Sequence, residues 1–211
     1  MSPEIGLCAA SFPCPGRWGC SWRLGLVLAD ISGKGISGAL LMANLQANLR
    51  SQYAVALEDL PRLLESVNRL LCESTPPSHF ATLIFGHYDD ATRRLRYING
   101  GHNPPLLLRA DGRWERLGAT ATVLGLFEDW RSTAAEVGLE PGDILVLYSD
   151  GVTEAMSDRG EEFGEERLLE CIRRQPPGQA SALLGSILAA VEEFSGREQE
   201  DDLTVIVVRA R

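Results

Sequence analysis

Two apolar stretches, residues 81–88 and 94–98, are separated only by residues 89–93, a short connection that begins DDAT at positions 89–92. A crossover to a parallel strand needs about a dozen residues or more, so these two stretches must pair as an antiparallel hairpin. Further strand patterns lie at residues 24–29, 105–109, 133–137, 144–148 and 203–208. Helical stripes of apolar residues lie within 41–53, 60–71, 163–172 and 183–194. Hairpins with helices grouped before and after them predict an α+β layered fold.

The chain has 211 residues, of which 45% are hydrophobic and 23% charged, a balance that predicts one globular domain with a sizeable core. Residues 1–23 mix Pro, Gly, Cys and Trp without a helical or alternating period, so we expect an irregular N-terminal segment there. The ordered domain is expected to cover residues 24–211.

The formal net charge is -9 at pH 7, which disfavours binding to nucleic acid or to an anionic membrane surface. The start of the chain lacks the features of a signal peptide, and no apolar run approaches the length of a membrane span. The 5 cysteines include no C-x-x-C pair and are interpreted as reduced thiols. These observations predict a cytoplasmic protein whose partner is a protein or a small molecule.

Aspartates adjoin three apolar strand patterns. Asp30 ends LVLAD, Asp150 ends LVLYSD, and Asp201 and Asp202 precede LTVIVV. Each one alone is explained by a turn, because aspartate is a common turn residue. Several carboxylates at one edge of a sheet repel one another, and a hard divalent cation such as Mg²⁺ or Mn²⁺ relieves that repulsion. The three segments together therefore predict a metal site.

Five strings of this sequence, in this order, resemble motifs of the PPM (type 2C) phosphatases: ADISGKGISGALLM, FATLIFG, YINGGHNPPLLL, LVLYSDGVTEA and DDLTVIVV. The similarity is greatest to the bacterial branch named for SpoIIE, which includes the stress sigma-factor phosphatases. The resemblance implies an antiparallel β-sandwich flanked by helices. It also implies hydrolysis of phosphoserine or phosphothreonine on a signalling protein, with an anti-sigma-factor antagonist as the candidate substrate.

The resemblance implies two bound Mn²⁺ or Mg²⁺ ions that activate water. Asp30, Asp150 and Asp201 match the family's carboxylate ligands, and the main-chain carbonyl of Ile31 matches a neighbouring oxygen ligand. Two metal ions suit this reaction because phosphate-monoester hydrolysis is very slow without catalysis, and a pair of ions supplies both a nucleophile and charge stabilisation.

Other residues of the same motifs are expected around the metals. Gly33 and Gly35 let the backbone approach metal or phosphate closely. Lys34 stands where many relatives carry a histidine and would attract phosphate. Asp202 is expected to support the ligands from outside the coordination shell, and His102, in its glycine-rich turn, is either structural or part of the site.

One family motif is missing from this chain. Relatives carry a Gly-Gly-Asp ligand segment one strand upstream of the LVLAD strand, whereas between Met1 and Ala29 the only acidic residue here is Glu4. The N-terminal strand region is therefore expected to be incomplete and the second metal to bind weakly. Two alternatives stay open, a pseudophosphatase that binds phosphoproteins and a metal hydrolase of another kind. A Ser-His-Asp hydrolase is disfavoured because no G-x-S-x-G occurs.

Overall fold

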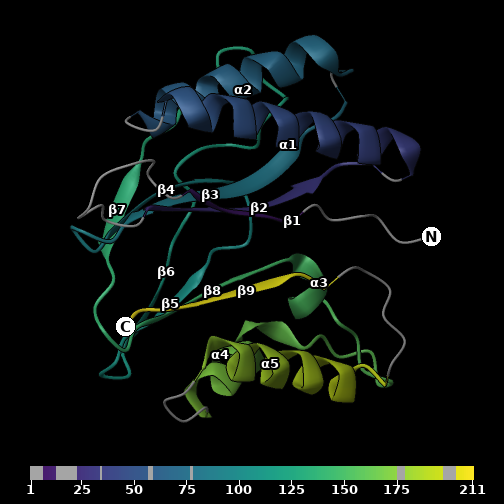
Figure 1. The fold of residues 1–211 in the computed structure, drawn as a ribbon. Coiled ribbons are helices and arrows are strands. Elements are labelled where there is room, and N and C mark those ends of the chain that lie inside the picture. The colour runs from purple at the N-terminus through teal and green to yellow at the C-terminus, as the bar shows by residue number, and fades with distance from the viewer. Residues whose placement is uncertain are drawn as a thin grey trace. The chain divides into compact units, whose positions relative to one another are not determined.

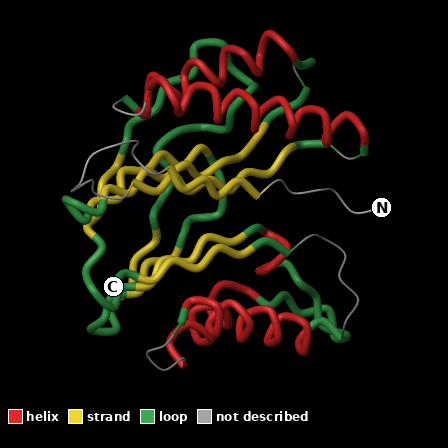
Figure 2. Tube along the Cα trace, in the orientation of Figure 1, coloured by secondary structure: helices red, strands yellow, loops and turns green. Residues whose placement is uncertain are grey.

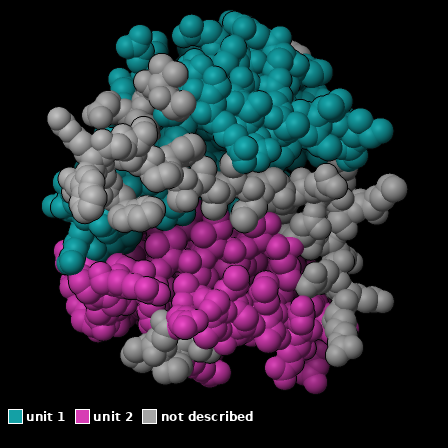
Figure 3. Space-filling view, in the orientation of Figure 1, with its two compact units in different colours: residues 1, 3–102, 118–139 teal, residues 2, 103–117, 140–211 magenta. Residues whose placement is uncertain are grey.

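The computed structural model describes two compact units (Figure 3). Unit 1 is built mainly from residues 3–102 and 118–139, and unit 2 from residues 103–117 and 140–211. The described residues are 7–12, 23–33, 35–56, 59–76, 78–174, 179–196 and 203–211. Each unit has its own antiparallel sheet and its own helices (Figure 1). Among the helices described in this way, none is long and apolar enough to cross a membrane.

Five strands form the sheet of unit 1, in the order β1-β2-β3-β4-β7, and all neighbours are antiparallel. Their bounds are β1 Leu7–Phe12, β2 Arg23–Ile31, β3 Ala81–Asp89, β4 Arg94–Gly100 and β7 Ala135–Gly138. Strands β3 and β4 form the predicted hairpin, with Asp89 opposite Arg94 and Arg93 at a positive φ of 54° in the turn. The adjacent long strands of this sheet are visible in Figure 2.

Helices α1 (Ile36–Ala56) and α2 (Leu60–Ser74) cover one face of this sheet (Figure 1). Helix α2 begins as its sequence predicts, because the Asp59 side chain accepts a hydrogen bond from the Arg62 amide and Pro61 occupies the first turn. The helices pack on alternate strand residues, which places Val27, Phe85 and Ile98 in the core. The remaining buried side chains that fill this core include Leu41, Leu45, Leu49, Leu60, Leu63, Leu64, Val67, Leu71 and Leu83.

The second sheet belongs to unit 2 and has four strands in the order β6-β5-β8-β9, also antiparallel. The strand bounds are β5 Leu106–Leu108, β6 Trp114–Arg116, β8 Ile144–Tyr148 and β9 Val205–Arg209. The helices are α3 Asp150–Thr153, α4 Gly164–Arg174 and α5 Ala180–Phe194. Its core joins Val146 and Tyr148 of the sheet to Leu168 of α4 and Ile187 of α5.

The predicted α+β class is confirmed by these two antiparallel sheets and their helices. The expectation of an irregular segment over residues 1–23 is wrong for Leu7–Phe12, which pair with β2 from Leu28 back to Arg23. Backbone pairing with a long neighbouring strand does not require an alternating pattern, so the sequence LCAASF did not reveal β1. Strand β6 was also missed, because three residues are too few to show a period.

Candidate metal centre

Asp30 lies at the end of β2 and leads into a glycine loop in unit 1. Its Oδ1 accepts a hydrogen bond of 2.8 Å from the Ile31 amide, and the side chain is half-buried. Gly33 and Gly35 follow with φ of 116° and 78°, values that residues with a Cβ rarely adopt. Ser32 fixes the loop to the start of β3: its amide donates to the Phe80 carbonyl and its Oγ accepts from the Phe80 amide.

A polar network lies beside Asp30 on the same sheet. Asp30 is directly opposite Thr82 of β3, so the two side chains are on one face. Thr82 Oγ1 lies 3.0 Å from Nδ1 of His102, which is only 7% exposed. The His102 amide donates to Oδ1 of Asn99, a fully buried residue at the end of β4. The structure thus brings the predicted residue His102 to within one side chain of Asp30.

His79 also adjoins the glycine loop, and the sequence analysis gave it no role. A Cβ built on Gly33 would lie 3.5 Å from Cδ2 and 3.6 Å from Nε2 of the His79 ring. Its Nδ1 is 3.2 Å from the Ser78 hydroxyl. No sequence motif joins positions 33 and 79; only the antiparallel pairing of β2 with β3 brings them together.

Asp150 of unit 2 follows β8 and is the first residue of the short helix α3. Its Oδ1 accepts a 2.8 Å hydrogen bond from the Gly151 amide, and the side chain is half-buried. The preceding residue, Ser149, is fully buried and bonded to Thr204 twice: its amide donates to the Thr204 carbonyl, and its Oγ accepts from the Thr204 amide, both at 3.0 Å. The start of the last strand segment therefore runs beside the Asp150 turn.

Three predicted site residues, Lys34, Asp201 and Asp202, lie outside the described residues. Within the described part of the chain, no group of three or more His, Cys, Asp or Glu side chains is arranged to hold a metal. The donors that are described, the carboxylates of Asp30 and Asp150 and the main chain at Ile31, all offer oxygen. Oxygen donors fit Mg²⁺ or Mn²⁺, whereas sites for softer metals use sulfur or imidazole.

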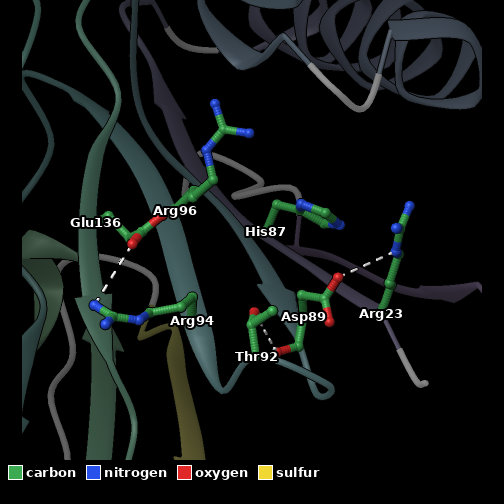
Figure 4. Close-up of a pocket in the computed structure, with 7 residues that line it drawn as sticks. All are labelled: Arg23, His87, Asp89, Thr92, Arg94, Arg96 and Glu136. Atoms are coloured by element: carbon green, nitrogen blue, oxygen red, sulfur yellow. Dashed lines mark hydrogen bonds and ion pairs between the residues drawn. The ribbon is translucent and has the colours of Figure 1, made fainter.

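A pocket of about 390 Å³ lies at the other end of the unit 1 sheet from Asp30, near the start of β2 (Figure 4). Two ion pairs line it, Arg23 Nε to Asp89 Oδ2 at 3.4 Å and Arg94 Nη1 to Glu136 Oε1 at 3.5 Å. Arg96, Thr92 and the buried His87 complete the lining. Because acids pair with Arg23 and Arg94, much of the positive charge of this pocket is balanced, and none of the predicted site residues lines it.

Two curated proteins are similar to this chain over most of its length. Protein IcfG of Synechocystis sp. is 29% identical over 212 residues, which cover 88% of this chain and 33% of IcfG. Phosphoserine phosphatase RsbU of Bacillus subtilis is 28% identical over 197 residues, which cover 89% of this chain and 56% of RsbU. The chain therefore spans about half the length of RsbU and a third of IcfG.

Solved structures of PP2C domains share the fold. The PP2C domain of SiaA from Pseudomonas aeruginosa superposes with a TM-score of 0.74 at 21% identity and covers 93% of this chain and 78% of that chain. The catalytic domain of the serine/threonine protein phosphatase PstP, solved with 2 manganese ions, gives a TM-score of 0.64 at 20% identity with 96% of each chain covered.

The family model described as Stage II sporulation protein E (SpoIIE) matches residues 21–211. That range takes in every motif of the expected metal centre, from the Asp30 strand through the His102 turn to the final DDLTVIVV. The matched range, the two antiparallel sheets with their helices, and the superposition on PP2C domains agree with one another. The chain therefore belongs to the SpoIIE family and has the fold of a PP2C-type phosphatase domain.

Proposed function

We propose that this chain is the catalytic domain of a metal-dependent protein serine/threonine phosphatase. The observation that carries the proposal is the Asp30 segment, where a half-buried carboxylate ends a strand and is followed by two glycines at positive φ. That loop presents main-chain atoms without Cβ atoms in the way, which suits the close approach of a metal ion or a phosphate group. The similarity to RsbU, a phosphoserine phosphatase, supports the same activity.

The proposed ligands for two Mn²⁺ or Mg²⁺ ions are Asp30, the Ile31 carbonyl, Asp150 and Asp201. When bound, the ions would activate water and offset the charge of the phosphate. Asp30 and Asp150 each accept a hydrogen bond at Oδ1 from the next amide in the chain, which orients the carboxylate. The solved structure of PstP with 2 manganese ions supports this choice of cofactor.

The residues around these ligands would bind and orient the phosphoryl group. Gly33 and Gly35 hold the loop open, and Lys34 between them supplies a positive charge. Asp202 and His102 are proposed to support the ligands without binding metal. The leaving serine oxygen needs a proton, and His79, whose ring lies 3.5 Å from the position that a Cβ on Gly33 would take, is the proposed donor.

The proposed substrate is a phosphorylated bacterial signalling protein in the cytoplasm, with an anti-sigma-factor antagonist as the specific candidate. The similarity to RsbU and to the SpoIIE family model supports this class. The competing function is a pseudophosphatase that binds a phosphoprotein without turning it over. It is favoured by one observation, that the Gly-Gly-Asp ligand segment is missing and Glu4 is the only acid before Asp30.

Binding of Mn²⁺ and turnover of a phosphoserine peptide, measured on the same preparations, separate these functions. We expect Asp30→Asn and Asp150→Asn to lower Mn²⁺ affinity by more than roughly 100-fold, beyond the usual effect of residues that only support ligands. The matched control is Asp90→Asn, which neutralises an exposed turn carboxylate. Metal-stimulated turnover that Asp30→Asn abolishes identifies the phosphatase, and tight phosphopeptide binding without turnover identifies the pseudophosphatase. Wild-type metal binding by both Asn variants would refute the proposed site.

A further inference from the structure

We propose that Thr82 and His102 form a hydrogen-bond relay that positions the carboxylate of Asp30. In this relay, Nδ1–H of His102 donates to the Thr82 hydroxyl, and the hydroxyl donates to Asp30. Both are positioning residues, since neither is required to touch metal or substrate. The inference rests on the proposed role of Asp30 as a metal ligand.

The strand register brings Thr82, the middle residue of the relay, beside Asp30. Asp30 and Thr82 are partners in the antiparallel pairing of β2 with β3. Side chains directly opposite each other on such a pair have Cβ atoms about 4.5–5.5 Å apart, within hydrogen-bonding reach for two short polar residues. Thr82 Oγ1 lies 3.0 Å from His102 Nδ1. The threonine therefore stands between the buried histidine and the carboxylate.

The direction of the bond between Thr82 and His102 decides what the pair does. If Nδ1 is bare, the hydroxyl donates to the ring and presents only lone pairs elsewhere. If Nδ1 carries a hydrogen, the ring donates to Oγ1 and the hydroxyl hydrogen is available to the carboxylate. An ionised carboxylate only accepts hydrogen bonds, so the second direction is the one that stabilises Asp30. Donors and acceptors aligned in one direction also polarise one another.

The histidine end of the relay is rigid. The His102 amide is bonded to Asn99 Oδ1 at 2.9 Å, and the Asn99 amide donates to Thr120 Oγ1 at 3.1 Å. Gly101 has φ of 75°, and a Cβ there would lie 2.9 Å from a methyl carbon of Val123, so only glycine fits. A buried ring whose backbone is held in this way is a fixed reference point for the threonine hydroxyl.

A fixed donor is useful because a shared metal ligand must hold one orientation. Oδ1 of Asp30 is already turned toward the Ile31 amide. A second donor from Thr82 would fix the rotation of the carboxylate about its own axis before metal arrives. Groups that orient metal ligands in this way typically change metal affinity or activity by roughly 10- to 100-fold when they are removed.

Paired substitutions test the relay by Mn²⁺ calorimetry on the whole chain. Thr82→Val removes the hydroxyl at nearly constant shape, whereas Thr82→Ser keeps it. His102→Leu removes the donor, whereas His102→Asn keeps an amide nitrogen near the position of Nδ1. We expect Thr82→Val and His102→Leu to weaken Mn²⁺ binding by roughly 10- to 100-fold, and their partners to retain most of it. Circular dichroism and thermal melting confirm that each variant is folded.

Asp30→Asn, measured beside these variants, separates the two proposals. If Asp30→Asn loses Mn²⁺ while Thr82→Val and His102→Leu bind as wild type, the relay is refuted and the metal site stands. If Asp30→Asn binds as wild type, the metal site fails and the relay with it. The relay is also supported if adding Thr82→Val to Asp30→Asn causes no further loss of Mn²⁺ affinity.

The direction of the relay has its own measurement, which needs no metal. The nitrogen chemical shifts of the His102 ring distinguish a protonated Nδ1 from a bare one in the metal-free protein. We expect Nδ1 to carry the hydrogen, and to lose that preference in Thr82→Val. A bare Nδ1 in the wild-type chain would overturn the proposal, whatever the calorimetry shows.

Discussion

Helices α1 of unit 1 and α5 of unit 2 both contain a glycine, and the two glycines have different surroundings. A Cβ on Gly38 in α1 would lie 2.7 Å from the carbonyl oxygen of Gly33, in the loop that follows Asp30. A Cβ on Gly185 in α5 would meet nothing within 4 Å. In unit 1 the helix and the aspartate loop are packed backbone to backbone. In unit 2 the Asp150 turn is bonded to the Thr204 segment, and α5 contributes to the core.

This difference indicates that a Cβ added to α1 reaches the loop after the proposed metal ligand Asp30, whereas one added to α5 at Gly185 reaches no neighbouring atom. The loop from Ser32 to Gly35 is held between the start of α1 and the start of β3, through the Ala39 amide on the Gly35 carbonyl and the bonds from Ser32 to Phe80. The Asp150 turn is held by the bonds of Ser149 to Thr204 and by hydrogen bonds within α3.

Of the two glycine substitutions, Gly38→Ala is expected to have the larger effect on Mn²⁺ binding. The new methyl cannot occupy a position 2.7 Å from a backbone oxygen, so the loop after Asp30 has to shift. We expect Mn²⁺ affinity to fall by at least roughly 10-fold, the size seen when a ligand is misoriented. Calorimetry with Mn²⁺ measures the loss, and circular dichroism checks the fold.

Gly185→Ala is the matched control in unit 2. Because nothing lies near its new Cβ, it should leave Mn²⁺ affinity unchanged and raise the free energy of unfolding by about 1 kcal/mol through helix propensity. The contrast between the units is broken if Gly38→Ala binds Mn²⁺ as tightly as Gly185→Ala does.

The second prediction compares a buried polar side chain in each unit that forms hydrogen bonds with the backbone of a loop. In unit 2 the buried Asp143, 3% exposed, accepts from Arg109 Nη1 at 2.8 Å and from the amides of Ala110 and Glu140. Removing one partner of a buried ion pair typically costs about 3–5 kcal/mol, and Arg109 keeps some solvent and a second acid, Glu115. We therefore expect Asp143→Ala to lower the free energy of unfolding by about 3 kcal/mol, measured by urea denaturation.

In unit 1 a neutral side chain bonds the connecting segment, so replacing that side chain should lower the free energy of unfolding by less. Buried Asn68 of α2 donates to the Phe127 carbonyl at 2.9 Å and accepts from the Gly125 amide at 2.8 Å. Asn68→Ala leaves these two backbone groups without their partner, at a cost of about 2 kcal/mol. Glu170→Ala, which removes an exposed acid paired with Arg174, should change stability by less than about 0.5 kcal/mol. Equal losses for Asp143→Ala and Asn68→Ala would contradict this ranking.

The sequence predicted the elements that have long apolar periods. Both helices of unit 1 follow from apolar spacing, the strand leading to Asp30 from a short apolar run, and the β3 and β4 hairpin from its short connection. The sequence did not predict strands β1 and β6, because these strands form by backbone pairing with a neighbour and show no alternation of side chains. A local sequence pattern does not show which other segment of the chain will pair with a given strand.

For the candidate site, the sequence predicted which residues belong to the loop but not what surrounds them. Aspartate at a strand end and glycine after it are visible in the sequence of Asp30 to Gly35. The contacts of Thr82 with His102 and of His79 with Gly33 join distant positions and depend on the strand register. The roles of Lys34, Asp201 and Asp202 stay predictions, because these residues lie outside the described part of the chain.

The last comparison is confined to alkaline pH and takes one buried tyrosine from each unit. Burial raises the pKa of Tyr53 in unit 1 to about 12, against a small opposing effect of Arg23. Burial also raises the pKa of Tyr148 in unit 2, helped by the charge of Glu165 and by the hydrogen bond that the Tyr148 hydroxyl donates to it. Both phenols therefore hold their protons more tightly in the folded chain than in the unfolded chain, where a tyrosine titrates near pH 10.

The sign of the pH dependence follows from this difference. Below pH of about 10 both states are neutral and the stabilisation is fully present; above it the unfolded chain loses protons that the folded chain retains, so stability falls. The loss from Tyr53 continues until its folded pKa of about 12. Each phenol can contribute a slope of up to about 1.4 kcal/mol per pH unit in that window.

Urea denaturation at several pH values above 9 should show that the free energy of unfolding falls less steeply with pH in Tyr53→Phe and in Tyr148→Phe than in the wild-type chain. Burial and the charge of Asp90 also raise the pKa of Tyr88, so Tyr88→Phe should change the slope in the same direction. A slope that is unchanged in Tyr53→Phe would mean that this phenol titrates alike in both states and that its burial against Gly25 is not maintained in solution.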